Sequence, residues 1–576
     1  MEELAAPPPP PSPAPPREDR GRWSALALGL LAATLFVALA TVRLGAQGPQ
    51  YDELHQATGA FTWLGSPPEL FCLDAFNRVC LLNTTYSGAI KTNLYGLYLR
   101  LSGGRFDLVS WRLCGVLLLA LGIALFPVLA RPGLPLWSLA VFLALLLSDA
   151  AVLLFGRFDW GPVSLALALR LAFLGLWLRS VDDPQPSPWT SFGLGALGGL
   201  ATFEKLSSCL LVLPLGLFLL VDGRRRTRRH GLAALAGLAA GAAPLALVNL
   251  GALLTGKGLI SLRNVSEPVS RSVPGFAAYL GELASLGQGG RIAEIVLGLP
   301  VWRREAGWEA VLLLAAVLGV AGAALLGRCR PAGIALASYG AVAVGLYFLP
   351  RATSYHHWIL ATPFQYAALV LALIGLARAA PSRRQRSLAV ALTVIVTVWI
   401  GIRVPNLIAV ERAFVRGSAS RSWSPALARL GSFAARQADQ AVFVAADWGV
   451  ATQIYCFANG RPGLVYEPYW HALEATDLRA DLRSIQAKSG RRLVYLVRLE
   501  PAADVIPGAR ARVEAALLSD PYWLEVPVEP EARLPGVRIR KLLAVEFPGR
   551  PGPAIPIGPE MREPSTGGEK ITGSPP

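Results

Sequence analysis

The stretch "TSFGLGALGGLATFEKLSSCLLVLPLGLFLLVD", residues 190–222, decides the topology of this chain. As a single helix it would be about 50 Å long, which is too long for a hydrocarbon core of about 30 Å. We therefore predict two short membrane crossings with Glu204 and Lys205 at the bend between them. Charges below the membrane surface need a polar cavity or a partner. The alternative is that the two residues form a turn in water at the membrane surface.

The composition around this stretch is that of a membrane protein. Hydrophobic residues occupy 53% of the 576 positions and charged residues 16%, and the mean hydropathy is +0.46. A soluble domain has about 25% charged residues. The apolar residues gather in stretches long enough to cross a bilayer. We predict about eleven spans, at residues 24–44, 109–130, 134–155, 161–179, 190–203, 206–222, 231–254, 307–327, 331–350, 355–377 and 387–409.

The basic residues are distributed as in a membrane protein. The net charge is +16, but the arginines lie in short runs between apolar stretches, such as "RRRTRRH" at 224–230 and "RRQR" at 383–386. The predicted spans place these runs on the same side as the N-terminus, which the positive-inside rule assigns to the cytoplasm. No basic surface with interleaved aromatic residues accompanies them, so we exclude nucleic acid as a partner.

The predicted fold class is a mainly α, polytopic membrane protein with a C-terminal soluble α/β domain. The proline-rich N-terminus cannot build a core and is predicted to be disordered. The first apolar run is predicted to be an uncleaved anchor, with a cleavable signal peptide as the alternative. The predicted units are a cytoplasmic tail (1–22), a transmembrane domain (23–410) with external loops 45–108 and 255–306, an external α/β domain (411–548) and a disordered tail (549–576).

Three polar clusters fall on the external face of this topology, which predicts an active site there. The first external loop contains the adjacent carboxylates Asp52 and Glu53, which could instead begin a helix, since acids stabilise helix N-termini. The turn "FGRFDWG" at 155–161 contains charges that could also form a solvated ion pair. The turn "PRATSYHHW" at 350–358 contains a histidine pair that could belong to an ordinary wet turn. The side chains of interest in these turns are Arg157, Asp159, Arg351, His356 and His357.

The cysteines give one candidate pair. Cys72 and Cys80, in "FCLDAFNRVC", both lie in the first external loop. They could form a disulfide if the compartment is oxidising. Two free thiols are the alternative.

The order and sidedness of several short motifs resemble the membrane glycosyltransferases of the GT-C superfamily. The closest branch is the protein O-mannosyltransferase and aminoarabinose transferase group. The resemblance covers about residues 24 to 410 and lies in "YDE", "KTNLYGLYLRL", "SWRL", "RFD", "GLATFEK" and "SYHHWILATPFQYAAL". The chain departs from that branch at "KTNL", where a Lys-Pro-Pro-Leu pattern is frequent, and at Leu206, where the branch often has glycine.

The resemblance implies roles for particular residues. Asp52, with Glu53 beside it, maps to the catalytic carboxylate of the family, Asp159 to a second acid and Lys205 to a lysine of the donor site. Cations around the leaving phosphate would stabilise its charge, and we expect these to be Lys205, Arg351 and Arg157. Glu204 is a further candidate for an acceptor-side or second acid. A divalent metal cation is the only cofactor expected, with Asp52, Glu53, His356 and His357 as its candidate ligands.

The sequence thus predicts an integral membrane glycosyltransferase in the cell inner membrane. It would transfer a sugar from a polyprenyl-phosphate donor to a hydroxyl of an envelope lipid, glycan or protein acceptor on the external face, with inversion. The alternative is a transporter or flippase of lipid-linked sugars. Inverted repeats would favour that alternative, and we find none in the sequence.

Overall fold

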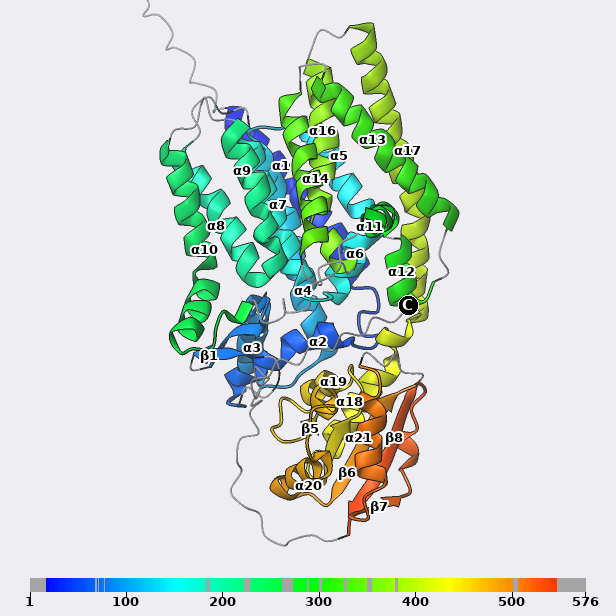
Figure 1. Cartoon of the computed structure of the whole chain (residues 1–576). Helices are drawn as coiled ribbons and strands as arrows, with labels where there is room; N and C mark the ends of the chain where they lie inside the picture. The colour runs from blue at the N-terminus through cyan, green and yellow to red at the C-terminus, as the bar shows by residue number, and fades with distance from the viewer. Residues whose placement is uncertain are drawn as a thin grey trace, which may run out of the picture.

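The computed structural model contains a helical bundle with a smaller α/β domain at one of its ends (Figure 1). The N-terminal end of α1 lies at the opposite end of the bundle from that domain. The structure describes residues 17–545 except for 68–69, 71, 77, 182, 184–186, 222–227, 262–272, 287–289, 300–302, 326–328, 350–354, 379–381 and 501–505.

Each predicted span coincides with a helix or with a broken pair of helices. Among the described residues, seven helices are long and apolar enough to cross a membrane, or eight if a bent pair is one span. The stretch 190–222 is broken after Glu204, as predicted. The helices are α1 (Arg17–Ala40), α4 (Leu108–Ala130), α5 (Leu136–Ser148) with α6 (Ala150–Phe158), α7 (Val163–Ser180), α8 (Pro188–Glu204), the 3₁₀ helix η2 (Leu206–Leu211) with α9 (Val212–Val221), α10 (Arg228–Leu254), α13 (Arg303–Leu325), α14 (Arg330–Phe348), α16 (Thr362–Arg378) and α17 (Arg383–Arg416).

Two segments differ from the sequence-based expectation. Helix α1 begins at Arg17, so the end of the predicted disordered tail is helical, because the run has no proline after Pro16 to stop the helix. Residues 1–16 and the predicted tail 549–576 lie outside the described residues. The predicted external loop 255–306 contains the helices α11 (Val273–Leu286) and α12 (Gly290–Leu297). Helix α11 packs on the bundle, where the Tyr279 hydroxyl donates a 2.6 Å hydrogen bond to the carbonyl of Ala343.

A buried charge network holds the bend between α5 and α6, whose axes differ by 66°. Asp149 ends α5, and its Oδ1 accepts from the backbone N–H of Ala151 at the start of α6. Its Oδ2 accepts from the Tyr366 hydroxyl at 2.7 Å and lies 3.8 Å from the Arg403 guanidinium, which is 3.7 Å from Glu309. Charges inside a helical bundle are expected to pair in this way. The bend directs α6 toward the domain end of the bundle.

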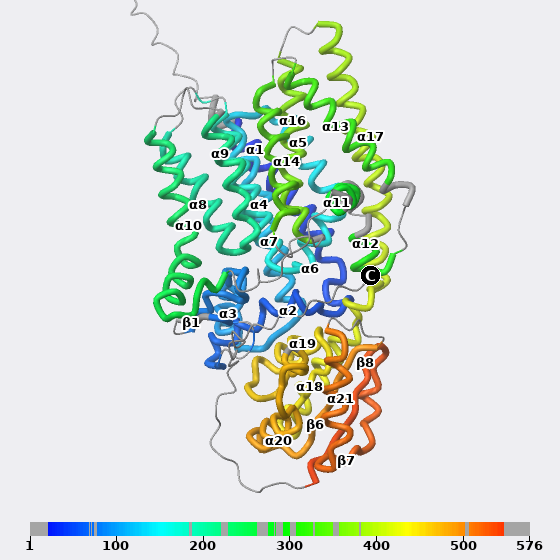
Figure 2. The backbone as a smooth tube through the Cα atoms, in the orientation of Figure 1, coloured from blue at the N-terminus to red at the C-terminus, as the bar shows by residue number. Residues whose placement is uncertain are grey.

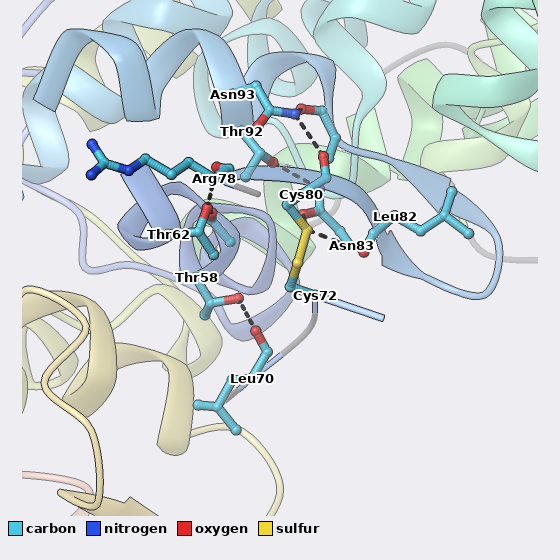
Figure 3. Close-up of a disulfide and its surroundings, with 12 residues drawn as sticks. Thr58, Thr62, Leu70, Cys72, Arg78, Cys80, Leu82, Asn83, Thr92 and Asn93 are labelled. Atoms are coloured by element: carbon cyan, nitrogen blue, oxygen red, sulfur yellow. Dashed lines mark hydrogen bonds between the residues drawn. A yellow bond between two sulfur atoms is a disulfide. The ribbon is translucent and has the colours of Figure 1, made fainter. Parts of the chain in front are cut away.

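Residues 45–108, predicted as the first external loop, form a compact layer over that end of the bundle. It contains α2 (Tyr51–Thr58), the 3₁₀ helix η1 (Gly59–Leu64), a three-stranded sheet and α3 (Ile90–Ser102). The strands β1 (Asp74–Phe76), β2 (Val79–Thr84) and β3 (Ser87–Gly88) are antiparallel in the order β1-β2-β3. Cys72 and Cys80 form a disulfide with their Cα atoms 5.7 Å apart (Figure 3). The first of the two alternatives for these cysteines is therefore the correct one.

The C-terminal region is a five-stranded sheet covered by helices on both faces. Its strand order is β5-β4-β6-β8-β7, with β5, β4 and β6 parallel and β8 and β7 antiparallel to their neighbours. The sequence predicts strands in "AVFVAADWG", "GLVYEP", "RRLVYLVRLE" and "VRIRKLLAVEF", which correspond to β4, β5, β6 and β8, and it does not predict β7. The elements are α18 (Pro425–Arg436), β4 (Ala441–Ala445), α19 (Ala451–Phe457), β5 (Val465–Tyr466), α20 (Leu478–Ser489), β6 (Leu493–Leu499), α21 (Ala509–Leu518), β7 (Trp523–Val526) and β8 (Val537–Ala544).

This α/β region docks directly on α2. The backbone trace places α19 beside α2 (Figure 2). The rings of Tyr51 and Trp448 lie 4.8 Å apart, and the Tyr51 hydroxyl donates a 3.0 Å hydrogen bond to Glu467. Phe61 and Tyr455 make an edge contact at 5.6 Å. The helix that carries the predicted catalytic carboxylate is therefore enclosed between the bundle and the α/β region.

Candidate active site

The start of α2 separates the roles of the two adjacent carboxylates. Gln50 is the N-cap residue, and its side chain accepts from the backbone N–H of Glu53 while Glu53 accepts from the backbone N–H of Gln50. This reciprocal pair is a capping box. Because Gln50 and Glu53 satisfy the helix end, Asp52 is not needed as its cap.

The Asp52 carboxylate contacts residues at the N-cap of α2, within α2 and in the turn after α6. Its Oδ2 accepts hydrogen bonds from the Trp160 indole at 2.9 Å and from the Gln50 side chain at 3.2 Å, and its Oδ1 lies 3.7 Å from Nδ1 of His55. Burial raises the pKa of this carboxyl, but His55, Trp160 and Gln50 together lower it by more, so the pKa lies below its ordinary value. The group is therefore an ionised proton acceptor, and its side chain is 29% exposed.

The turn after α6 brings Asp52 close to two other predicted residues. Trp160 contacts Asp52, and the next residue, Gly161, has a φ of +72° that favours glycine. A methyl group at Gly161 would lie 3.2 Å from Nζ of Lys205 and 3.9 Å from Nε2 of His356. The structure therefore brings Asp52, Lys205 and His356, which the sequence assigned to different parts of one site, together around one short turn.

The Lys205 ammonium is buried, with only 3% of the residue exposed. Within the part of the chain that the structure describes, its Nζ makes no hydrogen bond or ion pair. Its backbone is held by the hairpin beneath it, because Lys205 forms a bridge with Ser87 and the N–H of Leu206 donates to the carbonyl of Tyr86. The first alternative for residues 190–222, a buried bend at a polar site, is the one that the structure contains.

Glu53 forms a buried ion pair and does not face the site. Its two carboxylate oxygens accept from Nε and Nη2 of Arg112 at 2.6 and 2.9 Å. Arg112 also donates to the carbonyls of Leu44, Gln47 and Gly48. These contacts give Glu53 a structural role in place of the catalytic or metal-binding role predicted from the sequence.

Arg157 is engaged in the same way by the segment that leads into α2. Its guanidinium donates to the carbonyls of Ala40, Val42 and Arg43 and to the side chain of Gln47, at 2.7 to 2.9 Å. The cation also lies 4.0 Å from the centre of the Phe414 ring. These donors are used within the fold, so Arg157 is placed as a structural residue and not as the phosphate ligand predicted from the sequence.

Two other predicted acids bind groups that are far away in sequence. Asp159 pairs with Lys91 at 2.6 Å, and its other oxygen accepts from the backbone N–H groups of Val163 and Ser164 at the start of α7. Glu204 accepts from the backbone N–H of Ile90 at the start of α3, where a carboxylate is favoured by the helix dipole. Neither carboxylate is placed like the second or acceptor-side acid that the sequence predicts.

The histidine pair is divided between two environments. His356 packs against the Trp160 ring at 5.2 Å, and its Nδ1 has no hydrogen-bond partner within the described ranges. The ring of His357 lies 4.2 Å from that of His356, and its Nδ1 is 3.2 Å from the Ser207 hydroxyl. The expected phosphate ligand Arg351 lies outside the described residues.

The residues expected to hold a divalent metal do not fit a metal site. Arg112 occupies both oxygens of Glu53, and His357 Nδ1 faces Ser207. Among the residues described, no three His, Cys, Asp or Glu side chains come together as a ligand group. We therefore derive no step through a metal.

Sequence reasoning missed the partners that define these roles. Arg112, in "SWRL", and Lys91, in "KTNLYGLYLRL", are charges that stand in otherwise apolar surroundings. Such charges need partners, so their positions in the sequence already indicated that each would pair with a buried acid. Trp160 and Gln50 carried no comparable signal, because their contacts with Asp52 depend on the fold.

The disulfide stabilises the hairpin that holds Lys205. Cys80 lies on β2, which pairs with β3, and β3 forms the bridge to Lys205. Figure 3 shows the hairpin anchored to η1 and α3. The Thr62 hydroxyl in η1 donates to the Arg78 carbonyl, and the Asn93 side chain in α3 donates to the Cys80 carbonyl. A methyl group at Gly88 would lie 2.7 Å from the carbonyl oxygen of Phe203, so β3 contacts the end of α8 closely.

Replacing both Cys72 and Cys80 by Ser is expected to destabilise the hairpin, because the disulfide no longer restricts the unfolded chain. The loss should be about 2 to 3 kcal/mol, since the closed loop is short. Hydrogen exchange of residues 79–88 and of the backbone at Lys205 and Leu206, which the hairpin holds, should become faster. Treating the wild-type protein with a reductant should reproduce both changes, while the double variant should not respond to it. Unaltered hydrogen exchange in the double variant would contradict this role of the disulfide.

The fold is that of a polytopic membrane protein, a helical bundle with a C-terminal α/β region. No protein-family model matches the chain, and no curated protein matches it in sequence. In structure it is similar to ArnT from Cupriavidus metallidurans, solved as a crystal structure bound to undecaprenyl phosphate. The TM-score is 0.55 and the identity 14%, over 89% of this chain and 97% of that chain. This likeness confirms the predicted fold.

Proposed function

We propose that the chain is an integral membrane glycosyltransferase that uses a polyprenyl-phosphate-linked sugar as its donor. The observation that carries this proposal is the buried Lys205 ammonium, which has no hydrogen-bond or ion-pair partner among the described residues. Burying an unpaired ammonium is costly, so an anion from outside the chain is its expected partner. The similarity to a protein bound to undecaprenyl phosphate supports a lipid-linked phosphate as that anion.

The arrangement around Gly161 fits a single displacement at the anomeric carbon. Asp52 takes the proton of the acceptor hydroxyl while the oxygen of that hydroxyl forms the new bond to the anomeric carbon. The bond between the anomeric carbon and the phosphate oxygen breaks, and the electron pair leaves with the polyprenyl phosphate. Lys205, with His356 beside it, stabilises the negative charge on that phosphate. The displacement inverts the configuration of the anomeric carbon.

The acceptor and the cell location follow as further parts of the proposal. The acceptor is a hydroxyl of an envelope lipid, glycan or protein, and the branch is that of the protein O-mannosyltransferases and aminoarabinose transferases. The α/β region docks on α2 beside Asp52, which supports a role in enclosing the acceptor side. We place the protein in the inner membrane with its N-terminus in the cytoplasm, as the arginine runs favour.

Replacing Lys205 by Ala is expected to weaken donor binding by about 1.5 to 3 kcal/mol, the range of a charge-assisted hydrogen bond. The measurement is binding of a polyprenyl-phosphate sugar to the purified protein in nanodiscs. Lys488→Ala is the matched control, because Lys488 is exposed in the α/β region and should leave binding at the wild-type level. Wild-type donor affinity in the Lys205 variant would remove the basis of the proposal.

Transfer of a labelled sugar to an acceptor by the same nanodiscs separates a transferase from a transporter. A transferase forms a new glycoside in a single bilayer leaflet and needs no second compartment. In sealed vesicles that contain the same protein, movement of the donor across the membrane without a new glycoside would favour the transporter.

A further inference from the structure

The Trp160 indole connects the proposed base to the rest of the site. Its Nε1–H donates to Oδ2 of Asp52 at 2.9 Å. The ring lies beside His356, with the ring centres 5.2 Å apart, and makes an edge contact with Trp423 at 5.1 Å. The indole is therefore held between two other rings while its N–H points at the carboxylate.

The two oxygens of the Asp52 carboxylate have different surroundings. Oδ2 accepts from both Trp160 and Gln50, whereas the contact of Oδ1 with a described residue is the 3.7 Å approach to Nδ1 of His55. Oδ1 is therefore the oxygen with lone pairs left for an incoming hydroxyl. Holding a reacting group in one orientation lowers the barrier, because less freedom is lost on the way to the transition state.

We propose that Trp160 is a positioning residue for the transfer reaction, which fixes the Asp52 carboxylate so that Oδ1 faces the acceptor hydroxyl. The inference rests on the transferase function proposed above. The next residue, Gly161, lies against Lys205 and His356. The turn 159–161 therefore sets the position of the base relative to the phosphate-binding lysine. Trp160 acts through Asp52 and does not itself exchange a proton.

The test removes the indole N–H in two ways. Trp160→Phe removes the donor and part of the ring, and incorporation of 3-benzothienylalanine at position 160 replaces N–H by sulfur while the ring size stays close to that of indole. Both variants are expected to lower kcat about 10- to 100-fold, the cost of losing one hydrogen bond to a charged group. The KM for the donor should stay near the wild-type value, because Lys205 is untouched.

Trp423→Phe is the matched comparison, since the Trp423 Nε1 has no hydrogen-bond partner in the described part of the chain. It disturbs the packing around Trp160 but removes no bond to Asp52, so its effect on kcat should be much smaller. Wild-type kcat with 3-benzothienylalanine, or equal losses of kcat in the two Phe variants, would overturn the inference. Asp52→Asn separates this failure from that of the proposed function. Full transfer in that variant would show that Asp52 is not the base, which contradicts the proposed function itself.

Discussion

Replacing Asp52 by Asn is expected to lower the rate of sugar transfer by about 100- to 10,000-fold, the typical loss for a general base. The amide has the size of the carboxylate but cannot take a proton from the acceptor hydroxyl. The fold should be retained, because Gln50 and Glu53 cap α2 without Asp52. The measurement is the turnover of a labelled polyprenyl-phosphate sugar, with thermal unfolding and donor binding recorded on the same samples.

The control for this substitution is a second aspartate that has only a capping role. Asp477 begins α20, and its Oδ1 accepts from the backbone N–H of Ala480 at 3.0 Å. Asn caps helices about as well as Asp, so Asp477→Asn should leave both stability and turnover near wild type. If Asp52→Asn also transferred sugar at the wild-type rate, Asp52 would be a structural carboxylate and the proposed mechanism would be wrong.

The break in the stretch 190–222 could be predicted because it depends on a quantity that is local in the sequence. The length of the apolar stretch 190–222, set against the thickness of a bilayer, was enough to predict a break at Glu204 and Lys205. The position of the arginine runs then supported the number of spans. The helices in 255–306 were missed because that segment lacks a span-length apolar run, although α11 packs on the bundle through Tyr279.

The site was predicted only in part, because the role of a buried carboxylate depends on what occupies its lone pairs. Asp52 and Glu53 are adjacent and chemically similar, yet Arg112 binds both oxygens of Glu53, while Oδ1 of Asp52 has, among the described residues, a 3.7 Å contact with His55. Asp159 is likewise neutralised by Lys91. These partners lie far away in sequence, so no local pattern could assign the roles.

Replacing Arg112 by Met is expected to lower the free energy of unfolding by about 3 to 5 kcal/mol, as is typical when one partner of a buried ion pair is removed. Both Arg112 and Glu53 are fully buried, so the substitution leaves the Glu53 charge without compensation. It also removes the donors for the carbonyls of Leu44, Gln47 and Gly48. The measurement is denaturant-induced unfolding in detergent, together with sugar transfer, which should fall because this segment positions α2.

Two further variants separate the ion pair from simple packing. Adding Glu53→Met to Arg112→Met removes the uncompensated charge, so the double variant should be less destabilised than the sum of the two single variants. Arg436→Met is the control, because Arg436 pairs with Glu531 at the surface, where the side chains are 56% and 69% exposed. Such an exposed pair contributes only about 0 to 1 kcal/mol. If Arg112→Met cost no more than Arg436→Met, the Glu53–Arg112 pair would not be what holds the start of α2 in place.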